Sequence, residues 1–525
     1  MRRAFPLLLL LSCAHGSPPT EGTTQLELLS FNDFHGRLFS DASGQGGAAA
    51  MAAAIKRMRT DASLLVSAGD LVGASPLVSS HFHDEPTIQV MNEIGLDMLG
   101  VGNHEFDEGL AELLRLQRGG AHPSLEGTKR GFGGSQFRYL STNTLDAEGE
   151  LVFEPYHIVD VDGVQVAFLA ATLEGTKDIV PPVLGDVEFL DEADSITQWV
   201  DVLKERGVEA FVVLLHEGGW HEGGPNECDR LYGPVVDVVD RLPQEIDVVL
   251  AAHTQQTFVC PREDLLLASG GGYGRWITRV KLELSKATGD VVSARAENVP
   301  VLAKDGEDPR VAAIVQSYAE RVEPIAARGV GLIAAPIRRD PIRTGESPLG
   351  SVIADAQRAA TKADLAFMNL GGIRDDLGLE KDAVTYGDLF RIQPFDNRLV
   401  TKEYTGREIL QILEAQWGGT NEHGLFQVSE TLTYCYRPNG MPGAKIEAAS
   451  VKVRGRQLEP DATYVVALNS YLAQKPPFDR GRGAVVHGKD VDALVDYVRT
   501  RTPLSPPAIG RICRQDGNTA PAGPG

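Results

Sequence analysis

Residues 26–37 read LELLSFNDFHGR, an apolar run followed at once by a polar cluster. The run 26–31 predicts a buried strand, and Asp33 and His35 come directly after its carboxyl end. Side chains two residues apart on an extended segment point the same way, so these two can serve one site. The stretch therefore predicts a strand of an α/β fold that carries functional groups at its end.

The same arrangement recurs four times along the chain. Apolar runs at 63–68, 97–101, 210–215 and 247–252 each end in a polar cluster: Gly69-Asp70, Gly102-Asn103-His104, His216-Glu217-Gly218-Gly219 and His253-Thr254-Gln255. Apolar runs without alternation are typical of strands buried on both faces, and ligands gather outside the carboxyl ends of such strands. We therefore expect the five clusters to build one site.

The polar side chains at these strand ends are carboxylates, imidazoles and amides, which bind first-row divalent metals. With Asp70 shared, the set predicts two ions, one held by Asp33, His35, Asp70 and Gln255 and the other by Asp70, Asn103, His216 and His253. Two divalent ions bring +4 and the two aspartates bring −2, so the local charge favours a phosphate dianion. A metal pair also suits in-line displacement at phosphorus.

The motifs at 32–37, 69–70, 102–107, 216–219 and 253–255 resemble those of the calcineurin-like metallophosphoesterases, and more narrowly the exported 5′-nucleotidases. The resemblance implies a four-layer α/β/β/α sandwich followed by a second, smaller α/β substrate-binding domain. It implies the same two-metal partition. The ligand types themselves suit Zn²⁺, Mn²⁺, Mg²⁺ or Co²⁺ and do not select among them. It also implies a catalytic pair in which His104 stabilises the transferring phosphoryl group and Asp107 orients the imidazole.

A second block supplies the residues that the resemblance assigns to the substrate. Glycines beside an arginine, as in NLGGIR at 369–374, let the backbone approach a ligand while the guanidinium binds phosphate. The resemblance implies three kinds of substrate contact. Arg339, Arg343 and Arg374 would bind the phosphate side, and Asn369 and Asn397 would make polar contacts. Phe395 and Tyr471 would provide two aromatic faces for the base.

One segment departs from the family pattern. The relatives follow the second aromatic residue with Gly-Gly-Asp-Gly-Phe, whose aspartate contacts the ribose hydroxyls. This chain reads QKPPFDRG at 474–481, so Pro477 stands where the aspartate would be, and Asp479 is a substitute only if the loop is rearranged. We expect stacking of the base to persist while reading of the ribose is weakened.

The N-terminus has the features of an export signal. A basic start, a short apolar run and small residues predict a signal peptide over 1–12, and the sequence around Cys13 resembles a lipobox for lipid attachment. Ordinary cleavage nearby is the alternative. No later stretch approaches 18 uncharged apolar residues, so we expect contact with a membrane only through lipid. The predicted location is the periplasm or the cell surface.

The remaining chain divides into blocks of different character. We predict a tether at 13–24, a metallophosphoesterase domain at 25–303, an interdomain helix or linker at 304–330, a substrate-binding domain at 331–515 and a disordered tail at 516–525. Within the linker, residues 309–327 space apolar side chains as one amphipathic helix would. Four cysteines besides Cys13 allow three pairings. We favour Cys228–Cys260 and Cys435–Cys513, because each pair then stays within one domain.

Composition restricts the function further. With 72 acidic and 50 basic residues the net charge is −22, which argues against binding of a nucleic-acid polymer. The expected function is a dimetal phosphohydrolase of nucleotide catabolism and salvage, whose substrates are nucleoside 5′-monophosphates and, as further candidates, 2′,3′-cyclic nucleotides or UDP-sugars. Two alternatives are a thiosulfate-cleaving relative with a similar dimetal domain and a surface binding protein with an inactive site. The complete ligand set argues against the second.

Two histidines stand outside these motifs in an H-x-H pattern. His81 and His83 lie within a predicted helical stretch, on which side chains two apart diverge, so we expect them to be surface or structural residues. His122 matches no motif.

Overall fold

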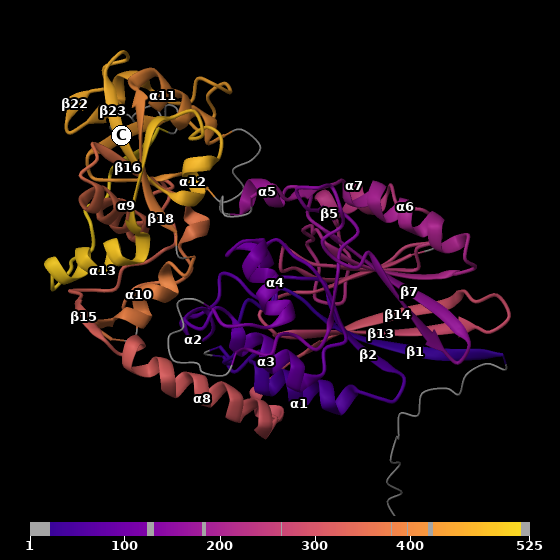
Figure 1. The fold of residues 1–525 in the computed structure, drawn as a ribbon. Coiled ribbons are helices and arrows are strands. Elements are labelled where there is room, and N and C mark those ends of the chain that lie inside the picture. The colour runs from indigo at the N-terminus through magenta and orange to yellow at the C-terminus, as the bar shows by residue number, and fades with distance from the viewer. Residues whose placement is uncertain are drawn as a thin grey trace, which may run out of the picture.

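The computed structural model describes residues 22–41, 43–122, 131–180, 185–263, 265–379, 381–395, 397–417 and 424–515. Figure 1 shows an N-terminal part in indigo through magenta to pink, a C-terminal part in orange to yellow, and helix α8 running between them. The predicted signal peptide, most of the tether, Cys13 and the tail lie outside the described residues. Within the described residues, no helix is both long and apolar enough to span a membrane.

Two six-stranded sheets form the N-terminal part. The first has the order β14-β13-β1-β2-β3-β4 and the second the order β11-β12-β10-β9-β7-β6. Strands β1 to β4 are mutually parallel, as are β7, β9, β10 and β12, so both sheets carry the predicted strand ends on a parallel core. The bounds are β1 Thr23–Phe31, β2 Ser63–Ser67, β3 Met98–Gly100, β4 Arg138–Leu140, β6 Tyr156–Val161, β7 Val164–Thr172, β9 Ala210–His216, β10 Val248–Ala251, β11 Thr257–Pro261, β12 Leu266–Gly270, β13 Trp276–Ser285 and β14 Val291–Pro300.

The two sheets pack face to face, and helices cover both outer faces. One core joins the inner faces through residues such as Leu28, Val66, Phe168 and Leu214. Separate cores lie beneath the helices on each outer side. This arrangement confirms the predicted four-layer α/β/β/α sandwich. Its helices are α1 Ala48–Met58, α2 Leu77–Ser80, α3 Glu85–Ile94, η1 His104–Phe106, α4 Leu110–Arg118, α5 Thr176–Ile179, α6 Glu192–Lys204, α7 Pro234–Val239 and η3 Ala303–Asp305, and a small sheet pairs β5 Thr144–Leu145 with β8 Glu188–Phe189.

The C-terminal part is also α/β. Its main sheet has the order β19-β16-β23-β18-β24, and a smaller sheet has the order β22-β21-β20-β25. One core packs α9 and α13 against the main sheet, and another packs α11 and β20 on its other side. The elements are β15 Gly329–Leu332, α9 Pro348–Thr361, β16 Leu365–Met368, η4 Leu370–Gly372, β17 Ala383–Thr385, α10 Tyr386–Ile392, β18 Arg398–Thr405, α11 Gly406–Ala415, β19 Gln427–Val428, β20 Leu432–Tyr436, η5 Ala448–Ser450, β21 Lys452–Val453, β22 Arg456–Gln457, β23 Thr463–Asn469, α12 Ser470–Gln474, β24 Arg482–Lys489, α13 Asp490–Thr500 and β25 Ile512–Arg514.

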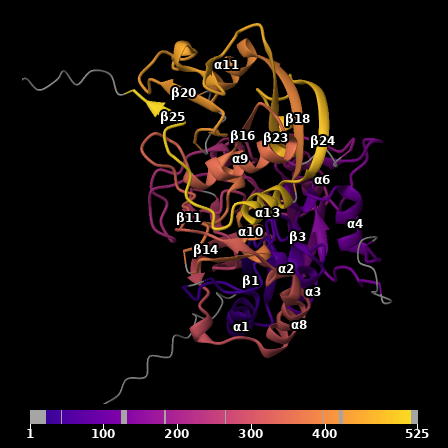
Figure 2. The ribbon, with the colours of Figure 1, turned by 90° about the vertical axis from the view of Figure 1, so that its left-hand side faces the viewer.

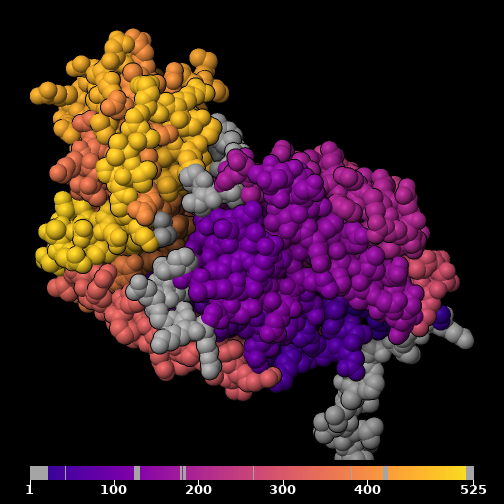
Figure 3. Space-filling model, in the orientation of Figure 1, coloured from indigo at the N-terminus to yellow at the C-terminus, as the bar shows by residue number. Residues whose placement is uncertain are grey.

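The helix predicted over 309–327 is α8, Pro309–Ala326, which Asp308 caps by accepting from the backbone N–H groups of Arg310 and Val311. In the two views of Figures 1 and 2, α8 runs along α1 and α3 and leads toward α10. Tyr318 packs against Phe82 of the N-terminal part with ring centroids 5.0 Å apart. Figure 3 shows the C-terminal part seated against one end of the N-terminal part. The exact domain boundaries remain predictions.

Both favoured disulfides are present, Cys228–Cys260 and Cys435–Cys513. The first ties the segment after β9 to β11, and the second joins the paired strands β20 and β25. The expected helical position of His83 is wrong. Helix α2 ends at Ser80, and His83 and Asp84 adopt left-handed backbone conformations in the turn before α3.

Candidate metal centre

The five predicted clusters converge where the carboxyl ends of the two sheets meet. Asp33, Asp70 and Asn103 follow β1, β2 and β3 of the first sheet. His216 ends β9 and His253 follows β10 of the second sheet. Because parallel strands deliver their carboxyl ends to one edge, ligands far apart in sequence become neighbours.

Asp70 lies at the centre of this group. Its Oδ2 is 3.6 Å from Nε2 of His35, and its Oδ1 is 3.2 Å from Nε2 of His216. Asn103 Oδ1 lies 3.1 Å from His216 Nε2 and 2.9 Å from His253 Nδ1, while Gln255 Nε2 lies 3.3 Å from His35 Nε2. The arrangement places a histidine on each side of Asp70, as two ions sharing this carboxylate would require.

Backbone geometry at the centre is unusual. Asp33, His35, Asp70, His253 and Gln255 all adopt positive φ angles, between 48° and 69°. Such conformations are costly for residues other than glycine and cluster at functional sites. Five of the seven predicted ligands are therefore held in conformations that the surrounding fold must enforce.

The histidine tautomers suit metal binding. His216 Nδ1 lies 2.7 Å from the carbonyl oxygen of Ala68, and His35 Nδ1 lies 2.9 Å from that of Gly73. Each Nδ1–H can donate to its carbonyl, which directs Nε2 toward Asp70. Without a metal, burial opposes protonation of His216, but Asp70 outweighs it and raises the pKa of His216 to about 10, so an ion bound at this Nε2 would replace a proton. Gly102 permits this close packing, because a Cβ there would lie 2.3 Å from Asp70 Oδ1.

The charges and burial of the residues in this centre favour binding of a cation. Burial raises the pKa of Asp33, and its buried Oδ1 has no hydrogen-bond partner. Burial lowers the pKa of His35 to about 3, so its imidazole is neutral, the form that binds metals. Burial opposes ionisation of Asp70, but the neighbouring His216 and His104 outweigh it and lower the pKa of Asp70. The donor set thus fits divalent ions, and Asp33 Oδ1 is the atom that needs one.

The predicted catalytic pair lies beside this centre. His104 Nδ1 is 2.8 Å from Asp107 Oδ2, and the His104 ring stands 4.9 Å from that of His35 at 78°. Burial opposes protonation of His104, but Asp107 and Asp70 outweigh it and raise the pKa of His104 to about 9. Its Nε2 edge is therefore a hydrogen-bond donor at neutral pH.

Glu105 is a buried residue of this site for which the sequence motifs predicted no role. Its carboxylate accepts from the backbone N–H groups of Asp70, Leu71 and Gly102 at 2.7–2.9 Å. It thereby joins the loop after β2 to the loop after β3, the two loops that carry Asp70 and Asn103. In the sequence, its acidic side chain inside the motif GNHEFD is the feature that could have indicated this role.

A cavity of about 1360 Å³ extends from the metal centre into the C-terminal part. It collects most of the predicted substrate residues, and its lining includes Asn103, His104, Asp107, His253, Arg339, Asn369, Arg374, Phe395, Asn397 and Tyr471. Phe395 lies 6.4 Å from the His104 ring at 28°, and the Arg374 guanidinium lies 5.6 Å from the Phe395 centroid. Residues of the two parts therefore face one another across this cavity.

Arg343 is the exception among the predicted substrate residues. It lines a neighbouring cavity of about 450 Å³, together with Trp417 and Tyr436. Arg339 lines the main cavity and remains 44% exposed. Asn397 is buried and accepts from Ser470 Oγ at 2.8 Å, so it also fixes the start of α12, where Tyr471 lies.

Tyr273 is a cavity residue that the sequence motifs did not predict. Its hydroxyl accepts a hydrogen bond from Arg374 Nη2 at 2.9 Å, which connects the two parts of the chain. The guanidinium groups of Arg37 and Arg275 lie 4.7 and 5.4 Å from its ring centroid. The glycine-rich segment GGGYGR at 270–275 was the signal for a functional loop.

The segment that departs from the family pattern lies away from the cavity lining. Asp479 is exposed, and its charge acts on Lys402 and Tyr404. Tyr471 instead has Lys475 beside it, with Lys475 Nζ 2.8 Å from the tyrosine hydroxyl and 4.1 Å from the ring centroid. The loop therefore offers an ammonium group near the predicted base site, and Asp479 is not part of the cavity lining.

Comparison with known proteins agrees with this geometry. The family described as "5'-nucleotidase, C-terminal domain" matches residues 326–476. The chain is 35% identical over 510 residues to Endonuclease YhcR of Bacillus subtilis, covering 93% of this chain but 41% of that protein. It is 31% identical over 535 residues to Cell wall protein Lmo0130 of Listeria monocytogenes, covering 91% of this chain and 67% of that protein.

A solved structure has the same fold. The 5'-nucleotidase precursor from Thermus thermophilus superposes with a TM-score of 0.75 at 23% identity, over 94% of this chain and 100% of that one.

Proposed function

Because the chain belongs to the 5′-nucleotidase family, a family of metal-dependent hydrolases, we propose that it releases phosphate from nucleoside 5′-monophosphates. One observation carries the proposal. A single cavity joins the histidine–carboxylate centre of the N-terminal part to Arg374 and Phe395 of the C-terminal part. Such a cavity can hold a phosphate at one end and a base at the other.

The metal end would hold two divalent ions through Asp33, His35, Asp70, Asn103, His216, His253 and Gln255. When bound, the ions supply positive charge for the phosphate and lower the pKa of a bound water. His104 donates a hydrogen bond to a phosphoryl oxygen, and Asp107 holds its imidazole in that orientation. Glu105 holds the loops that carry Asp70 and Asn103 at a fixed position relative to each other.

The substrate end would recognise the rest of the nucleotide. Arg374 carries a positive charge close enough to influence the pKa of His104, so it can bind phosphate oxygens beside the metals. Its hydrogen bond to Tyr273 fixes the guanidinium in the cavity. Phe395 and Tyr471 offer aromatic faces for the base. Asn369 is positioned by Asn469 Nδ2, which donates to its Oδ1 at 2.9 Å.

The proposal extends to location. The relative named a cell wall protein, the predicted signal peptide and two disulfides support export. We propose an exported enzyme that is anchored through lipid on Cys13. Fractionation of cells that express the chain and its Cys13→Ala variant tests the anchor. Wild-type protein in the soluble fraction, already lacking Cys13, would contradict it.

A phosphate-release panel tests the activity. Chelator-treated protein is supplied with Zn²⁺, Mn²⁺, Mg²⁺ or Co²⁺ and offered AMP, GMP, 2′,3′-cyclic AMP and UDP-glucose. Sulfate release from thiosulfate and strand cleavage of single-stranded DNA, followed by gel electrophoresis, are measured alongside. We expect phosphate from the 5′-monophosphates with at least one metal, and no cleavage of DNA. The DNA arm is included because one relative is named an endonuclease. Absence of phosphate release from every nucleotide with every metal would contradict the proposal.

A further inference from the structure

A second group of potential metal ligands lies outside the cavity lining, in the N-terminal part. His83, Glu108, Glu112 and His122 each offer one ligand atom, and these atoms all lie within 4.8 Å of one another. We call these four residues the α4 cluster. His83 lies in the turn between α2 and α3, Glu108 and Glu112 flank the start of α4, and His122 follows α4.

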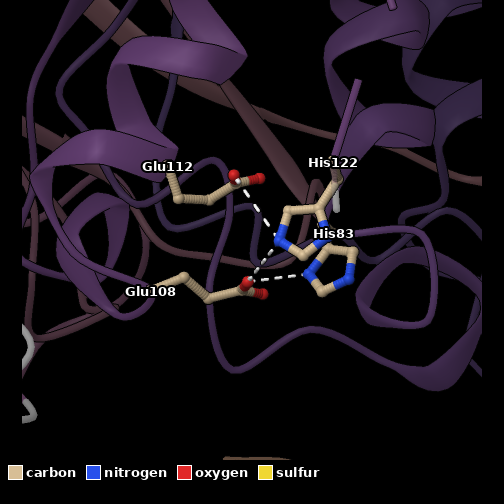
Figure 4. Close-up of side chains that lie close together, drawn as sticks. All are labelled: His83, Glu108, Glu112 and His122. Carbon is tan, nitrogen blue, oxygen red and sulfur yellow. Dashed lines mark hydrogen bonds and ion pairs between the residues drawn. The ribbon is translucent and has the colours of Figure 1, made fainter. Parts of the chain in front are cut away.

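The four side chains face one another (Figure 4). His83 Nδ1 lies 2.7 Å from Glu108 Oε2. His122 Nε2 lies 4.0 Å from Glu108 Oε2 and 3.8 Å from Glu112 Oε2. Ligands of a tetrahedral zinc ion with bonds of about 2.0–2.1 Å lie roughly 3.3 Å apart. The observed separations lie on both sides of this value. Binding of one ion by both imidazoles requires at least one ring to rotate out of its stack with the other.

The cluster is partly buried and already ordered. His83, His122 and Glu112 are only 19%, 17% and 11% exposed, and Glu108 is 45% exposed. Arg115 donates to Glu112 through Nε and Nη2 and also to Glu85. The Glu112 carboxylate, which faces His122, is therefore held in one orientation. Groups that orient a ligand in this way are typical of metal sites.

The two imidazoles are stacked, with ring centroids 3.4 Å apart and an interplanar angle of 20°. Two imidazolium ions at this distance would repel each other. The two rings place nitrogen atoms beside two carboxylates, a donor set that suits a divalent cation.

We propose that the α4 cluster is a zinc site separate from the dimetal centre. Two imidazoles and two carboxylates without thiolate suit Zn²⁺ or Co²⁺, whereas Mg²⁺ and Ca²⁺ prefer oxygen ligands alone. The ion fastens the start of α4 and the segment at His122 to the α2–α3 turn. Because Glu108 directly follows Asp107, the ion also stabilises the segment that carries the catalytic pair, without contacting substrate.

Metal stoichiometry tests the proposal. After equilibrium dialysis against Zn²⁺, elemental analysis should find three ions per wild-type chain and two per chain in His122→Ala and in Glu108→Gln. His81→Ala is the matched control, because His81 lies nearby, packs against Phe82 and is not in the cluster, so it should retain three. A wild-type value that saturates at two, or three ions retained in His122→Ala, would overturn the proposal.

A second measurement separates this site from the dimetal centre. In an Asp70→Asn background, which weakens the shared centre, calorimetric titration with Zn²⁺ should retain one binding event that His122→Ala removes and His81→Ala preserves. Circular dichroism confirms that each variant is folded. A binding event unchanged by both His122→Ala and Glu108→Gln would place the ion elsewhere and overturn the assignment.

Discussion

The metal end and the substrate end of the cavity are built in different ways. The five predicted ligand clusters sit at the ends of buried parallel strands, where sheet register fixes their positions. The substrate residues come from short helices and loops, such as η4, the segment at 393–397 and α12. Register is enforced by many backbone hydrogen bonds, whereas the loops depend on how the two parts of the chain pack. We therefore expect substitutions at the metal end to have larger effects.

Asp70→Asn should have the largest effect, because Asp70 is the predicted shared ligand at the metal end. Asparagine keeps the shape of Asp70 but removes the charge placed between His35 and His216. We expect turnover of AMP to fall by more than about 10³-fold and bound metal at the centre to decrease. Phosphate release and elemental analysis measure the two effects, and circular dichroism monitors folding. Full activity in metal-replete buffer would rule out Asp70 as the shared ligand.

His104→Ala separates chemistry from metal binding. The imidazole lies beside the centre but is assigned to the phosphoryl group, so kcat should fall by about 10²–10⁴-fold with metal content unchanged. Asp107→Asn should have a smaller effect in the same direction, because it removes only the partner that orients the ring. Loss of metal in His104→Ala would instead make His104 a ligand.

Glu105→Gln tests whether the fixed spacing of the loops after β2 and β3 makes the metal end more sensitive to substitution than the substrate end. The amide of glutamine leaves at least one of the three accepted backbone N–H groups without its acceptor, at a cost of about 1–3 kcal/mol. We expect a lower melting temperature and a metal affinity that is weaker by roughly 10–100-fold. Glu148→Gln, at an exposed carboxylate outside both groups of potential metal ligands, is the control and should leave melting temperature and metal affinity unchanged. Equal affinity in Glu105→Gln and wild type would show that register does not depend on this carboxylate.

The sequence predicts the metal end better than the substrate end, for the same reason that the two ends are built differently. An apolar run that ends in Asp, Asn or His indicates both a strand and the edge where its ligand lies, so the convergence around Asp70 could be predicted. The positive φ angles of the ligands and the three bonds of Glu105 could not, because they arise only when separate loops meet.

At the substrate end, the sequence was less informative. Phe395 and Arg374 face the cavity as expected, but Arg343 lines a neighbouring one and Tyr273 entered the site from the other part of the chain. His83 was assigned to a helix, which hid its approach to Glu108. These differences share a cause: the direction of a loop side chain is set by tertiary packing and not by local spacing.

Phe395→Ala probes the substrate end directly. Removing the ring that lies against His104 and Arg374 should raise KM for AMP by about tenfold, since stacking contributes about 1–3 kcal/mol per base. We expect kcat to change by less than KM. Steady-state kinetics with AMP measure both, and Tyr471→Ala should behave in the same way. A loss confined to kcat would show that Phe395 supports His104 and does not bind the base.

Discrimination of the ribose should give the smallest effect. Pro477 stands where the family resemblance leads us to expect an aspartate that contacts ribose. Asp479 is exposed, and its charge influences Lys402 and Tyr404. A hydrogen bond from a hydroxyl to a charged group contributes roughly 1.5–3 kcal/mol, and its absence should erase about tenfold or more of ribose preference. AMP and dAMP should therefore be hydrolysed with similar kcat/KM, and Asp479→Ala should leave the ratio unchanged. A strong preference for AMP that Asp479→Ala abolishes would mean that this loop moves to place Asp479 on the ribose, and that the substrate end is completed only when the nucleotide binds.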